Sequence, residues 1–492
     1  MKGILLLHDE HDNVQVLRDG DLLIKDNVIA KIGKDIQPNE DTEVIDCRGK
    51  IVSPGFVDAH HHVWQTQLKG RHSDDSLLDY HPKGNLQYFN YTAQDVFWGE
   101  LGGLMEAIDG GTTMVVDHAH MSLTPDRTLA GLSATLTSGI RSIFCPSLGP
   151  QIQRWDKDGY ELNASKPVPD FFMPQVKSLC QEVAKEPSGK VAIGLGFDAW
   201  YVGKEKTISV FKEARGAGCK FITSHWRRNN VAGSGGHSVP ETLKDYGLLG
   251  PDIILSHGTG STDEEFKMLK DSGSVVCMTP ATESQMAHGE VAGFRKDVFG
   301  CFGADCHSNN HASILHAMQV GLAVARSHRN SHIMSQGRFP KLIEPTTQQA
   351  FNLATIAGAR ALRMDGQIGS LKEGKQADIV IFSTESPSMT CVVDHDPVAA
   401  VVRHASNAEI EHVLVGGKFL KRDGKLCDVG VEGVDGWGSG LEETTLDWKT
   451  VAGELRKSRG EIQARINTCN VNAARRKVME GWGFTGGDEV FL

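Results

Sequence analysis

Three features that point to other classes of protein are missing from this 492-residue sequence. No run of residues approaches the roughly 20 apolar positions that a membrane-spanning helix needs, so we expect no membrane partner. The 62 acidic residues outnumber the 51 basic residues and give a net charge of −11. This argues against nucleic acid as a partner, because phosphate binding needs concentrated positive charge. The ten cysteines show no C-x-x-C spacing and no signal-like segment opens the sequence, so we expect free thiols in a cytoplasmic protein.

The motifs of two other enzyme classes are missing as well. The sequence contains neither a G-x-S-x-G motif around a nucleophilic serine nor a G-x-x-x-x-G-K-[S/T] phosphate-binding loop. The Gly-rich residues 233–237 do not open a helix after a strand, and we expect them to form a mobile loop near the site. Serine hydrolases and nucleotide-cleaving enzymes are therefore poor matches.

The sequence contains a β-rich segment near each end and a long middle part with a different pattern of apolar and polar residues. Residues 1–55 and 366–427 show short stretches of alternating apolar and polar residues, broken at turn pairs such as Asp19-Gly20. Because the two segments resemble each other, we predict one small β-sandwich domain formed from both ends of the chain. Residues 428–492 then form a Gly-rich linker and a helical tail, which either caps the barrel, contacts a second subunit or packs on its own domain.

The middle, residues 56–365, alternates short apolar runs with longer helical stretches. Eight of these runs are almost continuously apolar, as buried parallel strands are, and the chain between them is long enough for crossover helices. Eight such units in about 300 residues match the size of a TIM barrel. We therefore predict an α/β protein with a (β/α)8 barrel.

Polar side chains stand where several predicted strands end, and active sites of this fold lie at that end of the barrel. His60 and His62 are two residues apart on the first strand, so their side chains point the same way. The fifth, sixth and eighth strands end at His225, His257 and Asp305. Each histidine alone is more often an ordinary core or rim residue. Together they predict a site for one divalent metal with an open position for water.

The first strand also carries a family signature. The segment SPGFVDAHHH, residues 53–62, resembles the Pro-Gly-apolar-apolar-Asp-x-His-x-His core of the amidohydrolase superfamily. The likeness continues through LGGLMEAIDGGTTMVVDH and ILSHG to LATIAGARALRMDGQIGSLKEGKQADIVIF, so it covers about residues 1–425. Within the superfamily, the sequence is most similar to the branch of cytosine deaminases, guanine deaminases and triazine hydrolases.

The resemblance implies roles for the strand-end residues. His60, His62, His225 and Asp305 would bind the metal, and His257 would hydrogen-bond the hydrolytic water or the tetrahedral intermediate. Asp305 would also carry the proton of that water to the leaving group. Dinuclear members place a carboxylated lysine at the end of strand four, whereas this strand reads VAIGLGFDAWY. The resemblance therefore implies one metal ion, Zn²⁺ in the first place, with Fe²⁺ and Mn²⁺ as alternatives.

One departure from the family pattern bears on the substrate. Deaminase-like members have a glutamate three residues after the strand-five histidine, and this sequence has Arg228 there. A guanidinium cannot act as a general acid near pH 7, but it can bind a carboxylate. The sequence thus favours a carboxylate-bearing substrate, or an amide or lactam that is cleaved without ring protonation. The alternative is that Arg228 faces water.

Further polar and aromatic residues near the strand ends are candidates for substrate binding, although such residues are also common on the rim of this fold. Glu283 and His288 follow strand seven and could replace the missing glutamate. His118 and His120 follow strand two, and both are candidates for lining the pocket. The full set is Gln65, His118, Trp200, Arg228, Glu283 and His288.

These observations predict a metal-dependent hydrolase of a non-peptide C–N bond in a small molecule, acting by deamination or by amide or lactam cleavage. A halide-releasing hydrolase of a heterocycle is the alternative among enzymes. A non-catalytic, amidohydrolase-like scaffold is the alternative outside them, and it is disfavoured because every ligand position is filled. We also expect a homo-oligomer.

Overall fold

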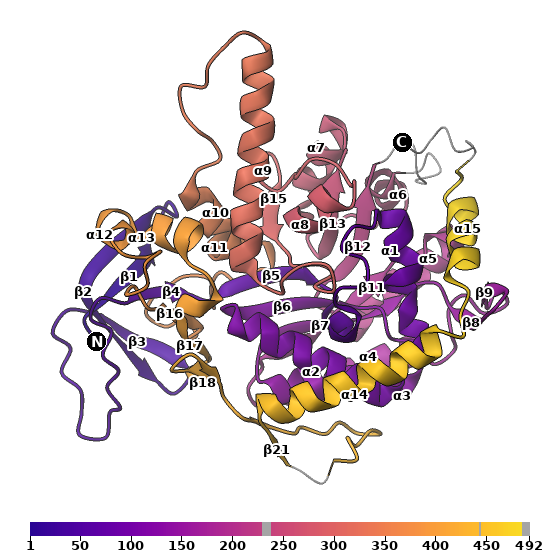
Figure 1. Ribbon diagram of the computed structural model, residues 1–492, viewed down its shortest axis with the longest axis horizontal. Helices are drawn as coiled ribbons and strands as arrows, with labels where there is room; N and C mark the ends of the chain where they lie inside the picture. The colour runs from indigo at the N-terminus through magenta and orange to yellow at the C-terminus, as the bar shows by residue number, and fades with distance from the viewer. Residues whose placement is uncertain (229–237, 442–443, 485–492) are drawn as a thin grey trace.

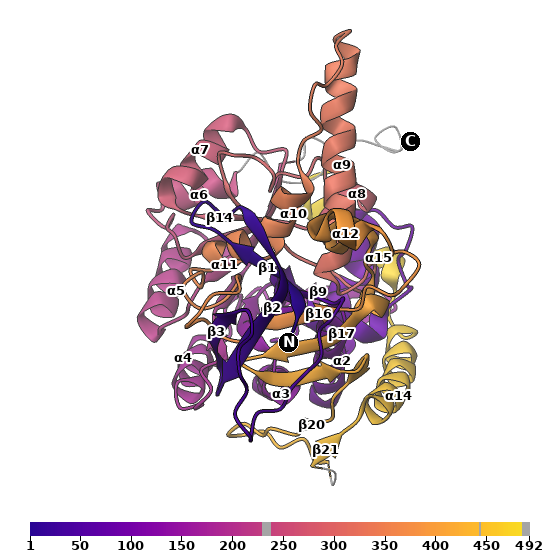
Figure 2. The same cartoon turned by 90° about the vertical axis from the view of Figure 1, so that its left-hand side faces the viewer.

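The computed structural model describes residues 1–228, 238–441 and 444–484. Residues 233–237, which we expected to form a loop near the site, lie outside this part of the chain. A barrel and a separate sheet stand side by side, and two helices of the C-terminal tail run along the barrel (Figure 1). Figure 2 shows the separate sheet from its own side.

Parallel strands form the barrel, and each pairs with its neighbour in chain order. They are β5 (Phe56–His61), β6 (Thr112–Ala119), β7 (Arg141–Leu148), β10 (Val191–Ile193) continued by β11 (Leu195–Phe197), β12 (Ile222–Arg227), β13 (Ile253–Thr259), β14 (Val275–Met278) and β15 (Phe299–Phe302). The ring closes where the Asp305 amide donates to the His60 carbonyl at 2.9 Å and the His62 amide donates to the Asp305 carbonyl at 3.1 Å. The predicted (β/α)8 barrel is confirmed.

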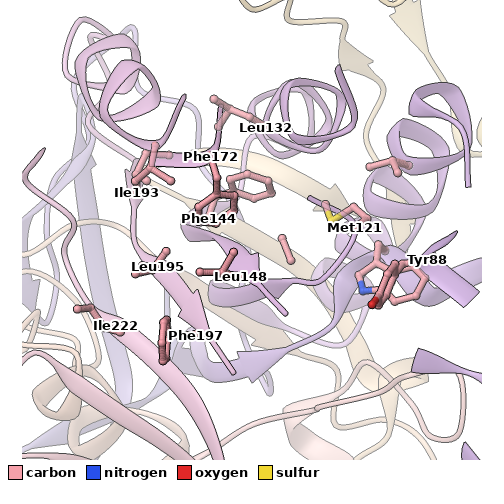
Figure 3. Packing of buried hydrophobic residues seen from close by; sticks show 14 of the residues in the cluster. Tyr88, Met121, Leu132, Phe144, Leu148, Phe172, Ile193, Leu195, Phe197 and Ile222 are labelled. Carbon is pink, nitrogen blue, oxygen red and sulfur yellow. The ribbon is translucent and has the colours of Figure 1, made fainter. Parts of the chain in front are cut away.

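Helices follow the strands and cover the outside of the barrel. They are α2 (Ala93–Asp109), α3 (Pro125–Ser138), α4 (Phe172–Val183), α5 (Lys204–Ala217), α6 (Val239–Asp245), α7 (Asp263–Ser272), α8 (Pro280–Gln285), α9 (Ile314–Ser335), α10 (Thr347–Ala354) and α11 (Ile356–Ala361). Their apolar faces pack on the strands, as Phe172 of α4 does near Phe144 of β7 (Figure 3). Burial of a side chain of this size contributes about 1.5–3 kcal/mol, so this layer holds the strand ends in place.

The separate sheet takes strands from both ends of the chain. Its order is β19-β18-β17-β16-β4-β1-β2-β3. The N-terminal strands are β1 (Gly3–His8), β2 (Val14–Lys25), β3 (Val28–Gly33) and β4 (Ile51–Pro54), and the C-terminal strands are β16 (Ile379–Phe382), β17 (Ile410–Val415), β18 (Lys418–Arg422) and β19 (Lys425–Leu426). The short helices α12 (Val392–His395) and α13 (Pro397–Ala399) lie between β16 and β17. A β domain from both chain ends was expected, and β4 pairing with β16 joins the two halves.

Gly55 separates the two sheets. The chain leaves β4 of the separate sheet at Pro54 and enters β5 of the barrel at Phe56. A Cβ atom at position 55 would lie 2.1 Å from the Thr113 hydroxyl oxygen. Only glycine therefore fits where the chain passes from one sheet to the other.

The C-terminal tail packs on its own barrel. After the short strands β20 (Val429–Gly430) and β21 (Thr445–Leu446), helix α14 (Trp448–Ile466) runs along α2 and helix α15 (Val471–Gly481) lies beside α1 (Leu77–Lys83) (Figure 1). The Ser458 hydroxyl donates to Asp95 at 2.6 Å, and Arg465 donates to the Asn90 carbonyl at 2.6 Å. A hairpin, β8 (Ile152–Asp156) and β9 (Gly159–Leu162), contacts α15 from the other side. The tail therefore packs on the barrel of its own chain.

Among the described residues, no helix combines the length and the apolar character needed to cross a membrane.

Candidate active site

Four side chains from three places on the barrel rim converge on one point. His60 belongs to β5, His62 follows it directly, His225 belongs to β12, and Asp305 lies three residues after β15. Each offers one ligand atom, and these atoms all lie within 4.8 Å of one another. This is the set that the sequence proposed as metal ligands.

The spacing of these atoms suits a tetrahedral ion. The His62 and His225 Nε2 atoms are 3.1 Å apart. Asp305 Oδ1 lies 3.2 Å from His62 Nε2 and 3.4 Å from His60 Nε2. Ligands at about 2.0–2.1 Å from a tetrahedral ion are separated by about 3.3 Å. Both His60 ring nitrogens are buried without a hydrogen-bond partner, and a metal would satisfy one of them.

Neighbouring groups fix the orientation of two of these histidines. The His62 Nδ1–H donates to the His118 carbonyl at 3.0 Å, and the His225 Nδ1–H donates to Asp198 Oδ2 at 2.9 Å. Each ring therefore turns its Nε2 lone pair toward the common point, as hydrogen-bonded metal ligands do. Burial raises the pKa of Asp198, but the adjacent His225 and His118 outweigh this and hold it well below its usual range. The Asp198 carboxylate is thus ionised.

A second cluster overlaps with the first. His118, His120, Asp198 and His225 also offer atoms within 4.8 Å of one another. However, Asp198 Oδ2 already lies 2.9 Å from His225 Nδ1 and 3.0 Å from His118 Nε2, and these are hydrogen-bonding distances. A neutral imidazole presents one lone pair, so His225 can serve only one of the two clusters. The hydrogen bonds account for the second cluster without an ion.

The backbone is strained at two of the site residues. His257 has φ of 75° and Asp305 has φ of 59°, which places both non-glycine residues in the left-handed region. Such conformations cost about 1–3 kcal/mol and persist where the surroundings enforce them. Here the pairing that closes the barrel enforces the Asp305 conformation. The strain is therefore concentrated where His257 and Asp305 face the metal ligands.

His257 stands next to the four converging side chains. Its Nδ1 lies 2.9 Å from the Thr279 hydroxyl and 3.5 Å from Glu283 Oε1, so a proton on Nδ1 is stabilised and Nε2 stays available. The ring of His288 packs edge-on against that of His257 with centroids 4.6 Å apart. Both His288 ring nitrogens are buried, and within the described part of the chain neither has a hydrogen-bond partner. Burial lowers the pKa of His288 well below 6.5, which makes this ring neutral.

A cavity of about 740 Å³ opens above the converging side chains. Its lower part contains His62, His225, His257, His288 and Asp305. Its upper part is rich in aromatic rings, which are Tyr80, Tyr88, Trp200, Tyr201, Trp226, Tyr246 and Trp482. A pocket of this size with an aromatic wall and a polar floor fits a planar organic molecule.

The candidates for substrate binding divide into two groups. Trp200 and His288 line the cavity, as does His120. Gln65, His118 and Glu283 are buried behind the cavity lining. Each of these three supports a residue of the site, because Gln65 donates to the Tyr80 hydroxyl at 2.7 Å, His118 lies against Asp198, and Glu283 lies near His257.

Arg228 does not fit its expected role as a substrate clamp. It is not part of the cavity lining, and its guanidinium forms an ion pair with Glu265 at 2.7 Å. Glu265 is fixed in turn, because it forms a capping box with Thr262 at the start of α7. The residue before it, Arg227, lines the cavity instead.

Alternation along β12 accounts for this difference, because Arg227 lies two residues after His225 and Arg228 lies three residues after it. The pairing of β12 with β13 is also irregular at this end. The register shifts between Trp226 and Arg227, so that Arg227 pairs with Thr259. The extra residue in β13 sits at Gly258, whose φ is 67°. Such a bulge bends β13 and increases the local twist where the two strands end.

Sequence reasoning missed several residues of the site. Asp198 ends strand four, and the rule that polar strand ends face the site could have identified it. Arg227 lies two residues after His225 on β12, so the alternation of side chains along a strand could have identified it as well. His81 of α1 and Trp482 after α15 also line the cavity, and both come from segments outside the barrel strands.

Comparisons with known proteins agree with this geometry. The model of the amidohydrolase family matches residues 51–420. A 5-methylthioadenosine/S-adenosylhomocysteine deaminase of Thermococcus sibiricus is 27% identical over 429 residues, which cover 83% of this chain and 91% of the relative.

Two solved structures share the fold. An adenosine deaminase of Xanthomonas campestris with bound zinc has a TM-score of 0.74 and 18% identity, covering 94% of this chain and 97% of that chain. The atrazine chlorohydrolase of Arthrobacter aurescens in complex with zinc has a TM-score of 0.71 and 18% identity, covering 93% and 99%. The chain therefore belongs to the amidohydrolase family and is a metal-dependent hydrolase of carbon–nitrogen bonds other than peptide bonds.

Proposed function

We propose that this enzyme removes an amino group from a nitrogen heterocycle of a small molecule, with one zinc ion held by His60, His62, His225 and Asp305. The observation that carries the proposal is the convergence of these four ligand atoms below an aromatic cavity. The deaminase relative and the zinc-containing structures of the same fold support it. Fe²⁺ and Mn²⁺ remain alternatives, because the same nitrogen and oxygen ligands bind them.

The metal would supply a nucleophile by lowering the pKa of a water molecule to near neutrality. Asp305 Oδ1 faces His60 and His62, which leaves Oδ2 to accept a proton from that water and return it to the leaving amine. His257 would hold the water or the tetrahedral intermediate through Nε2. Its Nδ1 stays occupied by Thr279 and Glu283.

His288 would take over part of the work of the missing glutamate. It is buried in the cavity lining, and neither ring nitrogen has a hydrogen-bond partner among the described residues. A neutral imidazole can donate one hydrogen bond and accept another, so His288 can hold a ring nitrogen of the substrate. Glu283 lies behind the lining and would orient His257.

The test combines metal content with product analysis. Protein stripped of metal is reloaded with Zn²⁺, Fe²⁺ or Mn²⁺, the metal is counted per chain, and ammonia release is measured on adenosine derivatives, guanine and aminotriazines. We expect about one metal ion per chain, ammonia release, and loss of both in His60→Ala. His11→Ala, a change of an exposed histidine far from the site, is the matched control. A folded, metal-loaded enzyme that releases no ammonia would contradict the proposal.

One observation favours a second candidate reaction. No carboxylate stands where deaminase-like members place their glutamate, and release of halide from a heterocycle needs no protonated amine as the leaving group. Chloride is therefore measured in the same panel on chlorotriazines, and acid release on amides and lactams. Release of chloride without release of ammonia would support halide release as the reaction and would contradict deamination.

We propose that the substrate carries an acidic group, now with Arg227 in place of Arg228 as the residue that binds it. We also propose that the enzyme works in the cytoplasm. All ten cysteines are free thiols, which suits a reducing compartment.

We further propose a homo-oligomer that forms through the end of α9. This helix projects from the body of the molecule (Figure 1). At its end and in the segment that follows, Met334, Phe339, Leu342 and Ile343 are exposed, Phe339 by 85%. Exposed apolar residues gathered in one place are typical of an interface, and light scattering on a Phe339→Lys, Leu342→Lys variant would test whether a second copy covers them.

A further inference from the structure

The far wall of the cavity comes from the C-terminal tail. Trp482 follows α15 directly, and its ring lies perpendicular to that of His81, with centroids 4.7 Å apart. On its other side, the guanidinium carbon of Arg227 lies 5.3 Å from the centroid of the Trp482 ring. His81, Arg227 and Trp482 all line the cavity that contains the metal ligands. A segment outside the family match of residues 51–420 is thus part of the site.

Specific contacts hold this wall in place. Arg475 of α15 donates to Asp79 of α1 at 2.8 Å, and α1 carries His81 and Tyr80 into the cavity. At the other end of α15, the Asn470 amide donates to the Asp156 carbonyl at 2.8 Å and the Asn470 side chain caps the helix. Two elements that belong to different ends of the chain therefore form one wall.

Arg227 is the unusual residue in this wall. Among the described residues, the guanidinium has the Trp482 ring beside it, and neither a carboxylate within ion-pair distance nor a hydrogen-bond acceptor. A guanidinium keeps its charge at neutral pH, so Arg227 brings a positive charge to the cavity wall. Its neighbour Arg228 shows the ordinary arrangement, an ion pair with Glu265. A partly buried cation without a counter-ion is costly unless a ligand supplies one.

The surroundings of Arg227 favour an anion over a neutral group. Burial lowers the pKa of His81 to about 3, so His81 adds no competing charge. The two carboxylates of the cavity, Asp198 and Asp305, lie against histidines of the floor. A guanidinium beside an indole ring offers two parallel N–H donors and an aromatic face, which match an acidic group attached close to a planar ring.

We infer that Arg227 and Trp482 form an anion subsite, and that the enzyme acts on heterocycles that carry a carboxylate or a similar acidic group on the side remote from the amine. This inference rests on the proposed function for the position of the reacting amine at the metal. The subsite itself depends on the cavity wall alone. The α15 end of the tail is then a specificity-determining element, because it supplies one of the two residues.

The test uses two ligands that differ only in charge. Hypoxanthine-9-acetic acid and hypoxanthine-9-acetamide, whose rings carry no amino group to remove, are titrated into the zinc-loaded full-length enzyme by calorimetry, so binding is measured without deamination. We expect the acid to bind at least about tenfold more tightly than the amide, since a hydrogen-bonded ion pair is worth more than a neutral contact. Arg227→Gln should abolish this preference, and Arg227→Lys should retain part of it.

Two further variants separate charge from structure. Arg228→Gln is the matched control and should leave the preference intact, because that guanidinium pairs with Glu265. Trp482→Leu should weaken both ligands by a similar factor, because the ring contributes an aromatic face and no charge. Equal binding of acid and amide by the parent enzyme, binding of neither, or a preference that survives Arg227→Gln overturns the inference. Failure of ammonia release with the acid preference intact would count against the proposed reaction only.

Discussion

The floor and the far wall of the cavity are built in different ways. The floor consists of strand ends of the barrel, where His62, His225 and Asp305 are each fixed by hydrogen bonds or by the closing pair of the sheet. The wall consists of α1 and α15, which an ion pair between partly exposed side chains, Asp79 and Arg475, joins at the surface. A rigid floor suits chemistry, which needs fixed distances. A wall from outside the strands can change with little effect on the barrel, which suits the choice of substrate.

The largest effect is expected on the floor. Asp305→Asn removes both a charged ligand and the group that would carry the proton, while its size and its backbone contacts stay the same. We expect turnover to fall by at least about 10³-fold, as measured by initial rates with the metal content determined in parallel. An enzyme that keeps a tenth of its activity would show that Asp305 is not the proton carrier.

His288 lies between floor and wall, and its replacement should have the next largest effect. His288→Phe fills a similar volume but can neither donate nor accept a hydrogen bond. We expect kcat to fall about 10²-fold with an unchanged metal content, within the range of a lost donor in an active site. A change in KM with an unchanged kcat would show that His288 contributes to substrate binding, like the residues of the wall, and not to the chemical step.

Asp198 tests whether the floor depends on groups behind the ligands. Asp198→Asn keeps a hydrogen-bond acceptor for His225 Nδ1 but loses the charge. We expect metal affinity to fall about 10–100-fold, measured by competition with a chelator. Unchanged affinity, or a second metal ion bound per chain in the parent enzyme, would assign Asp198 to another role.

How far the sequence predicts this site follows the same division. His60, His62, His225 and Asp305 could be recognised because parallel buried strands fix the direction of their end residues. The same rule could have identified Arg227, because it lies two residues after His225 on β12, but the family pattern directed attention to Arg228. Trp482 could not be recognised from the sequence. Its helix shows ordinary periodicity, and only its packing on α1 brings the ring to the cavity.

A buried acid pair below the floor provides a pH test. Burial raises the pKa of Asp117 to about 7, and the pKa of the adjacent Glu100 is raised well above its usual value. Since the folded pKa of Asp117 lies above the unfolded value of about 3.9, the folded state holds the proton more tightly. Stability from this group is then complete below about pH 4 and is lost as the pH rises through 7.

In the Asp117→Asn variant the side chain at position 117 is uncharged at every pH, so the variant does not lose stability as the pH rises. We expect its free energy of unfolding, relative to the parent protein, to rise by up to about 1.4 kcal/mol per pH unit between pH 4 and 7 and to level off above. Denaturant titrations at several pH values measure it, and the exposed Asp74→Asn provides the control. A constant difference across this range would mean that Asp117 titrates normally.

The smallest effect is expected from the surface contact that holds the wall. Asp79→Asn weakens the ion pair with Arg475, and ion pairs with partly exposed partners contribute about 0.2–1 kcal/mol. We expect KM to rise by no more than about fivefold and kcat to stay constant. A loss of kcat as large as that of Asp305→Asn would erase the distinction between floor and wall.

The pairing of β4 with β16 has a consequence for biosynthesis. Val52 pairs with Ile381. This strand pairing can form only after roughly 330 further residues have been synthesised. At about 5–20 residues per second, a ribosome needs on the order of half a minute to cover that interval. During this time Ile51 and its neighbours, which are buried in the finished protein, have no permanent cover. The apolar side chains of β4 therefore stay exposed until β16 has been synthesised.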